Sequence, residues 1–198
     1  SKPAMMIFKE RNGTAGWVVY HHKNTSAPAT QYLQLNSTNA TGTYAGYFNN
    51  TEPTSSVFTL GNDTGINQSG DTYIAYCFAD VQGYSKFGSY VGNGSNDGVF
   101  CYTGMKPSFV MIKRTDSTAS WLVFDNKRAN PFNEITADLR PDSSQAEDTD
   151  TSYNTLDFLS NGFKIRKSNG DINASGASYI YMAFAEEPLV GDNPATAR

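Results

Sequence analysis

The sequence predicts an all-β protein, a tandem of two related antiparallel β-sandwich modules of jelly-roll-like form with little helix. Hydrophobic residues make up 38% and charged residues 17%, and the remaining polarity comes from Asn, Ser, Thr and Gly, which favour turns over helix interiors. No ten-residue segment shows a convincing apolar period of 3.6 residues. The chain also repeats itself, which predicts two copies of one structural unit.

The repeat is clearest at the start of each copy. The segment KPAMMIFKERNGTAGWVVYHHK, residues 2–23, aligns with KPSFVMIKRTDSTASWLVFDNK, residues 106–127, with 8 of 22 pairs identical. Later, INQSGDTYIAYCFAD, residues 66–80, aligns with INASGASYIYMAFAE, residues 172–186, with 8 of 15 identical. The offset drifts from 104 to 106 in the polar middle, where loops absorb insertions at low cost. We therefore expect domain boundaries at 1–83 and 84–198.

Each copy begins with a predicted hairpin. MMIFKE and FVMIKR are followed by a polar stretch and then by WVVYHH or WLVFDN, the strand, loop, strand pattern of antiparallel β-structure. Weaker strands are predicted at 32–35 and 135–139. Further strands are predicted at VFTLG, residues 57–61, and GFKIRK, residues 162–167.

The segments YIAYCFAD, residues 73–80, and YIYMAFAE, residues 179–186, are uncharged until their last residue. Neither has a polar face to turn toward water, so both are predicted to be central strands covered on both sides. A further strand pair is predicted around the Gly and Asn rich turn at 92–98. The first copy lacks this pair, so we expect an upstream segment or a neighbouring chain to supply it, with Ser1 not the biological start.

Composition argues against several classes of partner. The net charge of −4 and the scattered Lys and Arg leave no basic field for nucleic acid. No apolar run is long enough to cross a bilayer, so membrane insertion is not expected, and residues 1–8 lack the features of a signal peptide. The two cysteines, Cys77 and Cys101, lack metal-site spacing and are expected to be small buried residues, with a disulfide between them left open.

The run KFGSYVGNGSNDGVFCYTGMKPSFVMIKRTDS, followed by WLVFDNKR, LSNGFKI, YIYMAFAEEP and PATAR, closely resembles modules at the C-terminal ends of tail-fibre-like and virion-associated proteins of tailed bacteriophages and prophages. The first copy, with WVVYHH, SSVFTLGN, INQSG and YIAYCFADVQGYSKFGSY, is similar to the module that usually precedes it. The resemblance implies an extracellular virion location and other virion proteins as partners. It carries over no catalytic or ligand residue.

Ligand-contacting candidates come from two patterns. Trp17 and Trp121 begin equivalent strands and are either core residues or stacking platforms for sugar rings. Residues that differ between the copies are freer to serve a ligand, which adds seven candidates: His21, Tyr32, Tyr44, Tyr47, Asp125, Arg128 and Arg140. Adjacent strand residues point to opposite faces, so His21 and His22 cannot chelate one ion and are expected at the surface.

No catalytic residue, metal ligand or cofactor is predicted. The acidic stretch 142–157 lacks the Gly that a calcium loop needs and is expected to be a solvated loop. Asp80 and Glu186 end equivalent strands and need not face one cleft, as a glycosidase pair must.

The expected function is attachment of a virion appendage to the host cell surface, through a glycan or another receptor. Loops rich in Asn, Ser, Thr, Tyr and Gly suit such recognition. The alternative is a purely structural decoration or adaptor protein of the virion. A homo-oligomer is expected, and a trimer is the form that fibre-like appendages commonly take.

Overall fold

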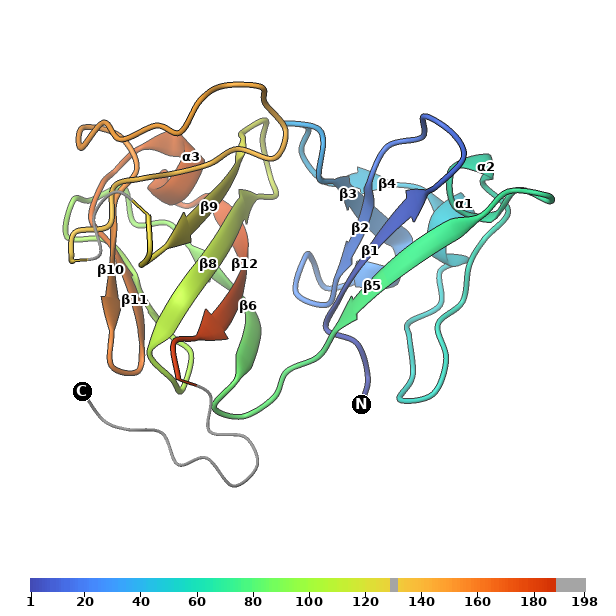
Figure 1. Cartoon of the computed structure of the whole chain (residues 1–198), viewed down its shortest axis with the longest axis horizontal. Helices are drawn as coiled ribbons and strands as arrows, with labels where there is room; N and C mark the ends of the chain where they lie inside the picture. Colours follow the sequence, from blue (N-terminus) through green and yellow to red (C-terminus); the bar gives the residue numbers. More distant parts are fainter. Residues whose placement is uncertain (129–131, 188–198) are drawn as a thin grey trace.

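The structure, a computed structural model, describes residues 1–128 and 132–187. Over these residues the chain forms twelve strands, three one-turn α-helices and one 3-10 turn (Figure 1). The strands are β1 (Met5–Glu10), β2 (Val18–His21), β3 (Gln31–Gln34), β4 (Gly42–Thr43), β5 (Tyr73–Phe78), β6 (Ser85–Val91), β7 (Phe100–Tyr102), β8 (Pro107–Arg114), β9 (Trp121–Asp125), β10 (Leu156–Leu159), β11 (Gly162–Ile165) and β12 (Ser178–Ala185). The helices are η1 (Pro28–Thr30), α1 (Ala45–Phe48), α2 (Thr64–Asn67) and α3 (Gly170–Asn173).

Every strand pair in the described residues is antiparallel, and the strands form three sheets. The five-stranded sheet has the order β4-β3-β2-β1-β5 and belongs to the first half, residues 1–83. The four-stranded sheet, β6-β12-β8-β9, and the three-stranded sheet, β10-β11-β7, belong to the second half, residues 84–198. The prediction of an all-β protein with little helix is confirmed.

The four-stranded sheet is the middle layer, because alternate residues of its strands enter different cores. In β8, Val110 and Ile112 face the three-stranded sheet, and Met111 faces the five-stranded sheet. In β12, Tyr181 faces the three-stranded sheet and Ile180 faces the five-stranded sheet. This alternation follows from the two-residue period of a strand, so one sheet supports both neighbouring layers.

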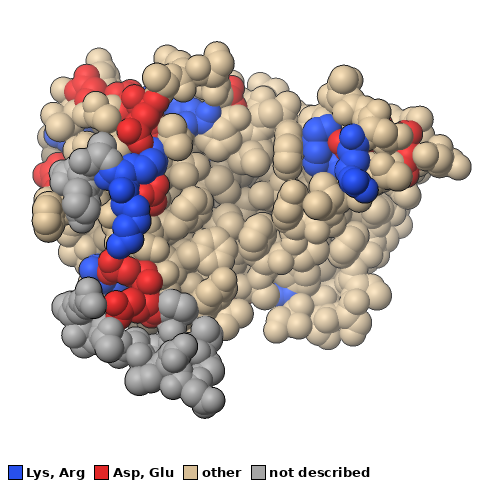
Figure 2. Space-filling view, viewed as in Figure 1, with Lys and Arg blue, Asp and Glu red and all other residues tan. Residues whose placement is uncertain are grey.

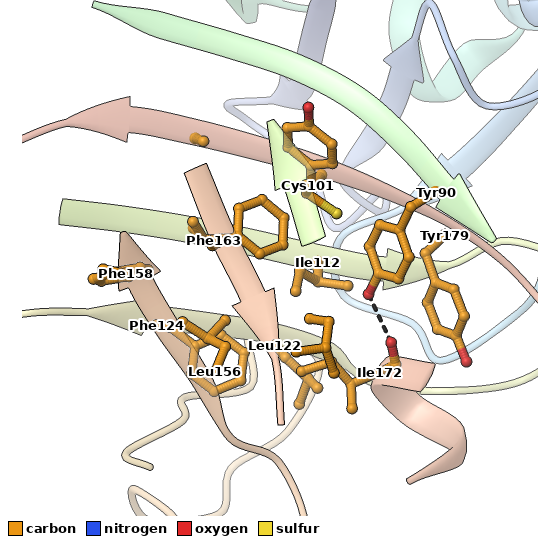
Figure 3. Close-up of a cluster of buried hydrophobic side chains, with 14 of the residues drawn as sticks. Tyr90, Cys101, Ile112, Leu122, Phe124, Leu156, Phe158, Phe163, Ile172 and Tyr179 are labelled. Atoms are coloured by element: carbon orange, nitrogen blue, oxygen red, sulfur yellow. Dashed lines mark hydrogen bonds between the residues drawn. The ribbon is translucent and has the colours of Figure 1, made fainter. Parts of the chain in front are cut away.

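The core between the four-stranded and three-stranded sheets is rich in aromatic and branched side chains, including Phe124, Leu156 and Phe163 (Figure 3). The hydroxyl of Tyr90 lies within this core and donates a hydrogen bond to the carbonyl oxygen of Ile172 at 2.7 Å. The polar tip of a buried tyrosine is thus satisfied, as burial requires.

The two halves also share a core. Met5 and Val19 of the five-stranded sheet pack in one cluster with Met111, Trp121 and Met182 of the four-stranded sheet. Polar contacts cross the same boundary. The indole Nε1 of Trp121 donates to the carbonyl oxygen of Gln34 at 2.9 Å. The halves therefore pack sheet against sheet.

The other face of the five-stranded sheet is covered by short, mostly irregular segments. Phe8 and Tyr20 pack there against Phe48 of α1 and Ile66 of α2. The corresponding face of the four-stranded sheet is covered by a complete sheet. The first half therefore has a thinner outer layer than the second.

Both predicted hairpins are confirmed, as β1-β2 and β8-β9, and their registers agree. Met5 pairs with Phe78 in the first half, as Phe109 pairs with Phe184 in the second. These pairs are related by the offsets of 104 and 106 found in the sequence. The agreement extends to the next strand, where Val19 pairs with Leu33 as Val123 bridges to Leu139.

The one-turn helices α2 and α3 occupy equivalent positions and begin in the same way. The side chain of Asp63 accepts a hydrogen bond from the backbone N–H of Gly65 at 2.7 Å. Asn169 caps α3 in the same manner, through the N–H of Asp171. Such side-chain caps satisfy amides that lack partners at a helix start. The repeat thus preserves the cap as well as the strands.

The largest departure from expectation concerns β5. It was predicted to be a central strand covered on both sides, and that prediction holds for β12, which lies between β6 and β8. For β5 it is wrong. β5 is the edge strand of its sheet, and its residues 74–77 are exposed (Figure 1). The reason is that no described strand occupies beside β5 the place that β6 occupies beside β12.

Several other predicted strands also differ from the strands in the structure. The strand predicted at 162–167 is present as β11, but residues 57–61 form no strand. Residues 135–139 make only isolated bridges, to Leu156 and Val123 among others. The strand pair around 92–98 is present as β6 and β7, which pair with different sheets and not with each other.

The cysteines also differ in their surroundings. Cys101 is buried as expected, whereas Cys77 on β5 is exposed, and both are free thiols. His21 was expected at the surface, but its side chain is only 1% exposed. None of the helices in the described residues is long and apolar enough to cross a membrane.

Candidate functional site

Three of the tyrosines singled out in the sequence come together in the first half. Tyr32 lies on β3, Tyr44 precedes α1 and Tyr47 lies within it. The ring of Tyr47 packs edge to face on both others, with centroid distances of 4.7 Å to Tyr32 and 5.0 Å to Tyr44. We call this group the tyrosine cluster. Tyr44 is its most open member, at 44% exposed.

Two glycines let the outer rings lie against the backbone. A Cβ atom on Gly42 would come within 2.6 Å of the Tyr32 ring, and one on Gly46 within 2.4 Å of the Tyr44 ring. Only glycine leaves room for these rings at such a distance. The local sequence TGTYAGYF therefore positions the tyrosine cluster as well as supplying two of its rings.

A carboxylate lies beside the tyrosine cluster. A hydrogen bond to Asp63, together with the charge of that carboxylate, raises the pKa of Tyr44. Burial, followed by the charge of Asp63, raises the pKa of Tyr47 to about 12. Both phenols therefore stay protonated and can donate hydrogen bonds. Aromatic edges, hydroxyl donors and one carboxylate together suit a polyhydroxylated ligand.

A second candidate place is a shallow hollow in the second half, at the ends of β8, β9 and β12. Its lining residues are Lys106, Asn126, Lys127, Phe132, Asn133, Ile135, Phe158 and Glu186. Within it, the Asn126 amide donates to Glu186 at 2.8 Å, and Lys106 pairs with the same carboxylate at 2.5 Å. The side-chain oxygen of Asn126 is buried and has no hydrogen-bond partner in the described part of the chain.

That unpaired oxygen marks the hollow as a place where a ligand or water with a donor group would be stabilised, since buried acceptors are normally satisfied. The exposed ring of Phe132, 76% accessible, lies at its rim. The pKa of Glu186 is lowered, first by its hydrogen bond with Lys106 and by the charge of that lysine, against the effect of burial. The carboxylate therefore stays ionised.

The remaining sequence candidates lie elsewhere. His21 and Trp121 are each 1% exposed, so neither offers surface to a ligand, and Trp121 takes the core role. Trp17 is partly buried and its ring stacks on Tyr76 of β5 at 6.5 Å. None of the three belongs to the tyrosine cluster.

Asp125, Arg128 and Arg140 are held in ion pairs. Arg128 pairs with Asp125 and also with Glu147 at 2.6 Å. Arg140 pairs with Asp138 and with Asp148, each at 3.1 Å. These contacts tie the acidic loop onto β9. Residues 143–147 and 149–153 are exposed, as predicted for a solvated loop, but residues 154–157 are buried and the last two of them belong to β10, so that part of the prediction is wrong. The ion pairs of Asp125, Arg128 and Arg140 therefore serve to hold the fold together.

Sequence reasoning missed Asp63, Asn126 and Phe132. Asp63 carries a readable signal, since an Asp that begins a short helix is a typical cap. Asn126 and Phe132 carry none, because their roles depend on strand ends meeting in space. Among the described residues, no group of three or more His, Cys, Asp or Glu side chains is placed to hold a metal ion.

Searches among curated proteins and among solved structures found no match to this chain. A comparison with protein families matched residues 1–188 to the family described as "Domain of unknown function (DUF7483)". The match spans nearly the whole chain, including both halves and all twelve strands. The chain therefore belongs to the DUF7483 family.

Proposed function

We propose that the chain is the receptor-binding part of a virion appendage, and that it attaches to a glycan on the host cell surface through the tyrosine cluster. The observation that carries this proposal is the cluster itself. Tyr32, Tyr44 and Tyr47 differ from the residues at the equivalent places of the second half, and they lie in one edge-to-face group beside Asp63. The phage location rests on the sequence resemblance.

We also propose that each half is one copy of a β-sandwich module. Equal strand registers and equal helix caps support this view. A further support is the tyrosine that opens β5 and its counterpart in β12. The hydroxyl of Tyr73 donates to the carbonyl of Thr64 at 2.7 Å, and that of Tyr179 donates to the carbonyl of Gly170 at the same distance.

The test of glycan attachment is binding of the purified, folded chain to a glycan array and to host cells. Tyr44→Ala removes the exposed ring of the tyrosine cluster, and Tyr153→Ala is the matched control, because Tyr153 is also exposed, at 53%, and lies outside the cluster. An aromatic contact contributes about 1 kcal/mol, which corresponds to roughly a fivefold loss of affinity for Tyr44→Ala alone.

Binding that Tyr153→Ala leaves intact and Tyr44→Ala weakens would support the proposal. A folded chain that binds no glycan and adsorbs to no cell would overturn it. Binding that is lost with Phe132→Ala and kept with Tyr44→Ala would move the site to the hollow that contains Asn126.

A second function is favoured by a different observation. The open edge of β5 is a surface for protein contact, which suits a decoration or adaptor protein of the virion. Under this alternative, a map of an assembled particle would show the tyrosine cluster buried between subunits. Analytical ultracentrifugation of the purified chain tests the homo-oligomer that either function allows.

A further inference from the structure

The same strand has two different environments in this molecule. β5 and β12 are equivalent in sequence, in register and in the helix that precedes each of them. β12 is covered along one edge by β6, over seven pairs from Ser178 opposite Val91 to Phe184 opposite Ser85. No strand in the described residues pairs with the corresponding edge of β5. The second half therefore shows what a covered edge looks like.

The register identifies the backbone groups that are left open. The N–H of Arg11 donates to the carbonyl of Thr72, so alternate residues of β5 from Thr72 onward direct their backbone groups toward β1. The intervening residues, Tyr73, Ala75 and Cys77, direct theirs to the free edge. In β12 the equivalent residues face β6, and the contacts that flank the pair, from Gly92 N–H to Ala177 and from Ala185 N–H to Tyr84, fit this pattern.

A second segment without a partner strand lies in the layer above. In the second half, β7 pairs with β11, and Phe163 and Ile165 of β11 are fully buried. In the first half, the segment that follows the same order in the sequence, residues 57–60, has no strand partner. Val57 is 63% exposed and Phe58 is 36% exposed. The ring of Phe58 lies 5.4 Å from Phe8 on β1, which places Phe58 against the strand that pairs with β5.

The open edge of β5 and the unpartnered segment 57–60 correspond to one covering element, because β6 and β7 are consecutive in the chain and pair with β12 and β11 respectively. We propose that the first half binds a strand, turn, strand segment of the β6-β7 pattern, supplied by another polypeptide chain. Its first strand adds antiparallel to β5, and its second strand pairs with residues 57–60. This inference does not depend on glycan binding.

The chemistry of the surface fits such an occupant. β5 carries no charged side chain, and most of the surface over it is uncharged (Figure 2). Exposed, uncharged edge strands are templates for strand addition, in which backbone hydrogen bonds supply affinity. Pairing of β5 with β5 of a second copy would cover one edge and leave Val57 and Phe58 exposed. A strand pair covers both.

One position gives the site a specificity that can be tested. Opposite Tyr181 the covering strand has Gly88, and a Cβ there would lie 2.4 Å from the Tyr181 hydroxyl oxygen and 2.5 Å from the nearest carbon of its ring. The residue equivalent to Tyr181 in β5 is Ala75, which is small. An occupant of the first half can therefore carry a larger side chain at the position of Gly88. The second half cannot accept that change without moving Tyr181.

The experiment uses a synthetic peptide with the sequence of residues 85–102 and two changes. Cys101→Ser prevents a disulfide with the exposed Cys77. Gly88→Val prevents the peptide from replacing β6 beside Tyr181. The full chain is incubated with this peptide, and hydrogen exchange of backbone amides is followed by mass spectrometry. A peptide of the same composition in scrambled order is the control.

We expect exchange in 73–78 and in 57–60 to slow at least about tenfold with the Gly88→Val peptide, since pairing protects edge amides. Exchange in β12 should not change. Ala75→Pro removes an outward N–H and leaves the pairing with β1, so it should abolish the protection. Cys77→Lys places a charge on the same edge and should weaken the protection even if Ala75→Pro does not fold.

Three results would overturn the inference. One is unchanged exchange in 73–78 at saturating peptide. Another is protection of β5 that rises with protein concentration and needs no peptide, which would assign the edge to a second copy of this chain. The third is equal protection by the scrambled peptide. Loss of glycan binding in Tyr44→Ala would leave all of these outcomes unaffected.

Discussion

β5 and β12 share a sequence pattern, a register and a preceding capped helix, yet one is exposed and the other buried. The difference lies in their neighbours. β12 has strands on both edges and sheets on both faces, whereas β5 has a strand on one edge only. Two strands of similar sequence can therefore be central or at an edge, depending on which strands lie beside them.

The largest expected effect comes from placing the same charge on both strands. Ala183 is fully buried, and Cys77, the equivalent residue of β5, is exposed. Ala183→Asp should lower the free energy of unfolding by about 3–5 kcal/mol, because it buries an unpaired charge. Cys77→Asp should change it by less than about 0.5 kcal/mol, as surface substitutions do. Urea unfolding measures both, and equal losses would contradict the assignment of β5 as an open edge.

The equivalent lysines Lys9 and Lys113 give the next contrast. The Lys113 ammonium is fully buried and donates to the carbonyls of Ala119, Arg114 and Thr38 at 2.9–3.2 Å. Lys9 is partly buried and donates to two carbonyls of its own loop.

Lys113→Met should cost about 2–4 kcal/mol, since it leaves buried carbonyls without donors. Lys9→Met should cost less than about 1 kcal/mol, because water can replace the lost donor. Thermal unfolding of the two variants checks the order. A larger loss for Lys9→Met would show that the contact between the halves contributes little.

A pH dependence distinguishes His21 from its counterpart, Asp125. Burial, then the charge of His22, lowers the pKa of His21 to about 3. Its Nδ1 accepts from the N–H of Lys23, so its Nε2 carries the proton toward the carbonyl of Tyr181. The folded state therefore holds the ring neutral, while the unfolded chain protonates it below its ordinary pKa near 6.5.

Stability from His21 is complete above pH 6.5 and is lost as the pH falls from 6.5 toward 3, by up to about 1.4 kcal/mol per pH unit. His21→Gln, which cannot titrate, should show a shallower fall over this range than the wild type. Urea midpoints between pH 7 and pH 4 measure the difference. Parallel curves for the two proteins would show that His21 is not held neutral by the fold.

The smallest effect concerns the two thiols. Cys77 is exposed on β5 and Cys101 is buried beneath Tyr90 and Phe163 in the second half. Burial raises the pKa of both thiols, that of Cys101 to about 12. A thiol reagent should modify one cysteine in the folded chain and two in denaturant. Modification of both cysteines in the folded chain would contradict the burial of Cys101 between the four-stranded and three-stranded sheets.

Much of the fold could be read from the sequence. The hairpins, the two-residue period and the repeat offsets are local or pairwise features, and they correctly predicted β1-β2, β8-β9 and the shared register. The exposure of β5 could not be read, because edge or centre depends on whether a neighbour is present. Residues 57–61 failed as a strand for the same reason, since the sequence that favours a strand found no partner.

The candidate site was likewise predictable only in part. Tyr32, Tyr44 and Tyr47 could be selected because they differ between the copies, but their meeting depends on how α1 folds back over β3. The burial of His21 was not predictable from its residue type. It follows from the packing of the five-stranded sheet on the four-stranded sheet, where His21 contacts Phe87.

The most direct measurement compares amide hydrogen exchange of the outward residues of β5 with that of their counterparts in β12, in the purified chain without any peptide. The amides of Ala75 and Cys77 should exchange at least about a hundredfold faster than those of Tyr181 and Ala183, because only the latter are paired with β6. Comparable slow exchange in the two strands would show that β5 already has a partner, and would contradict the open edge.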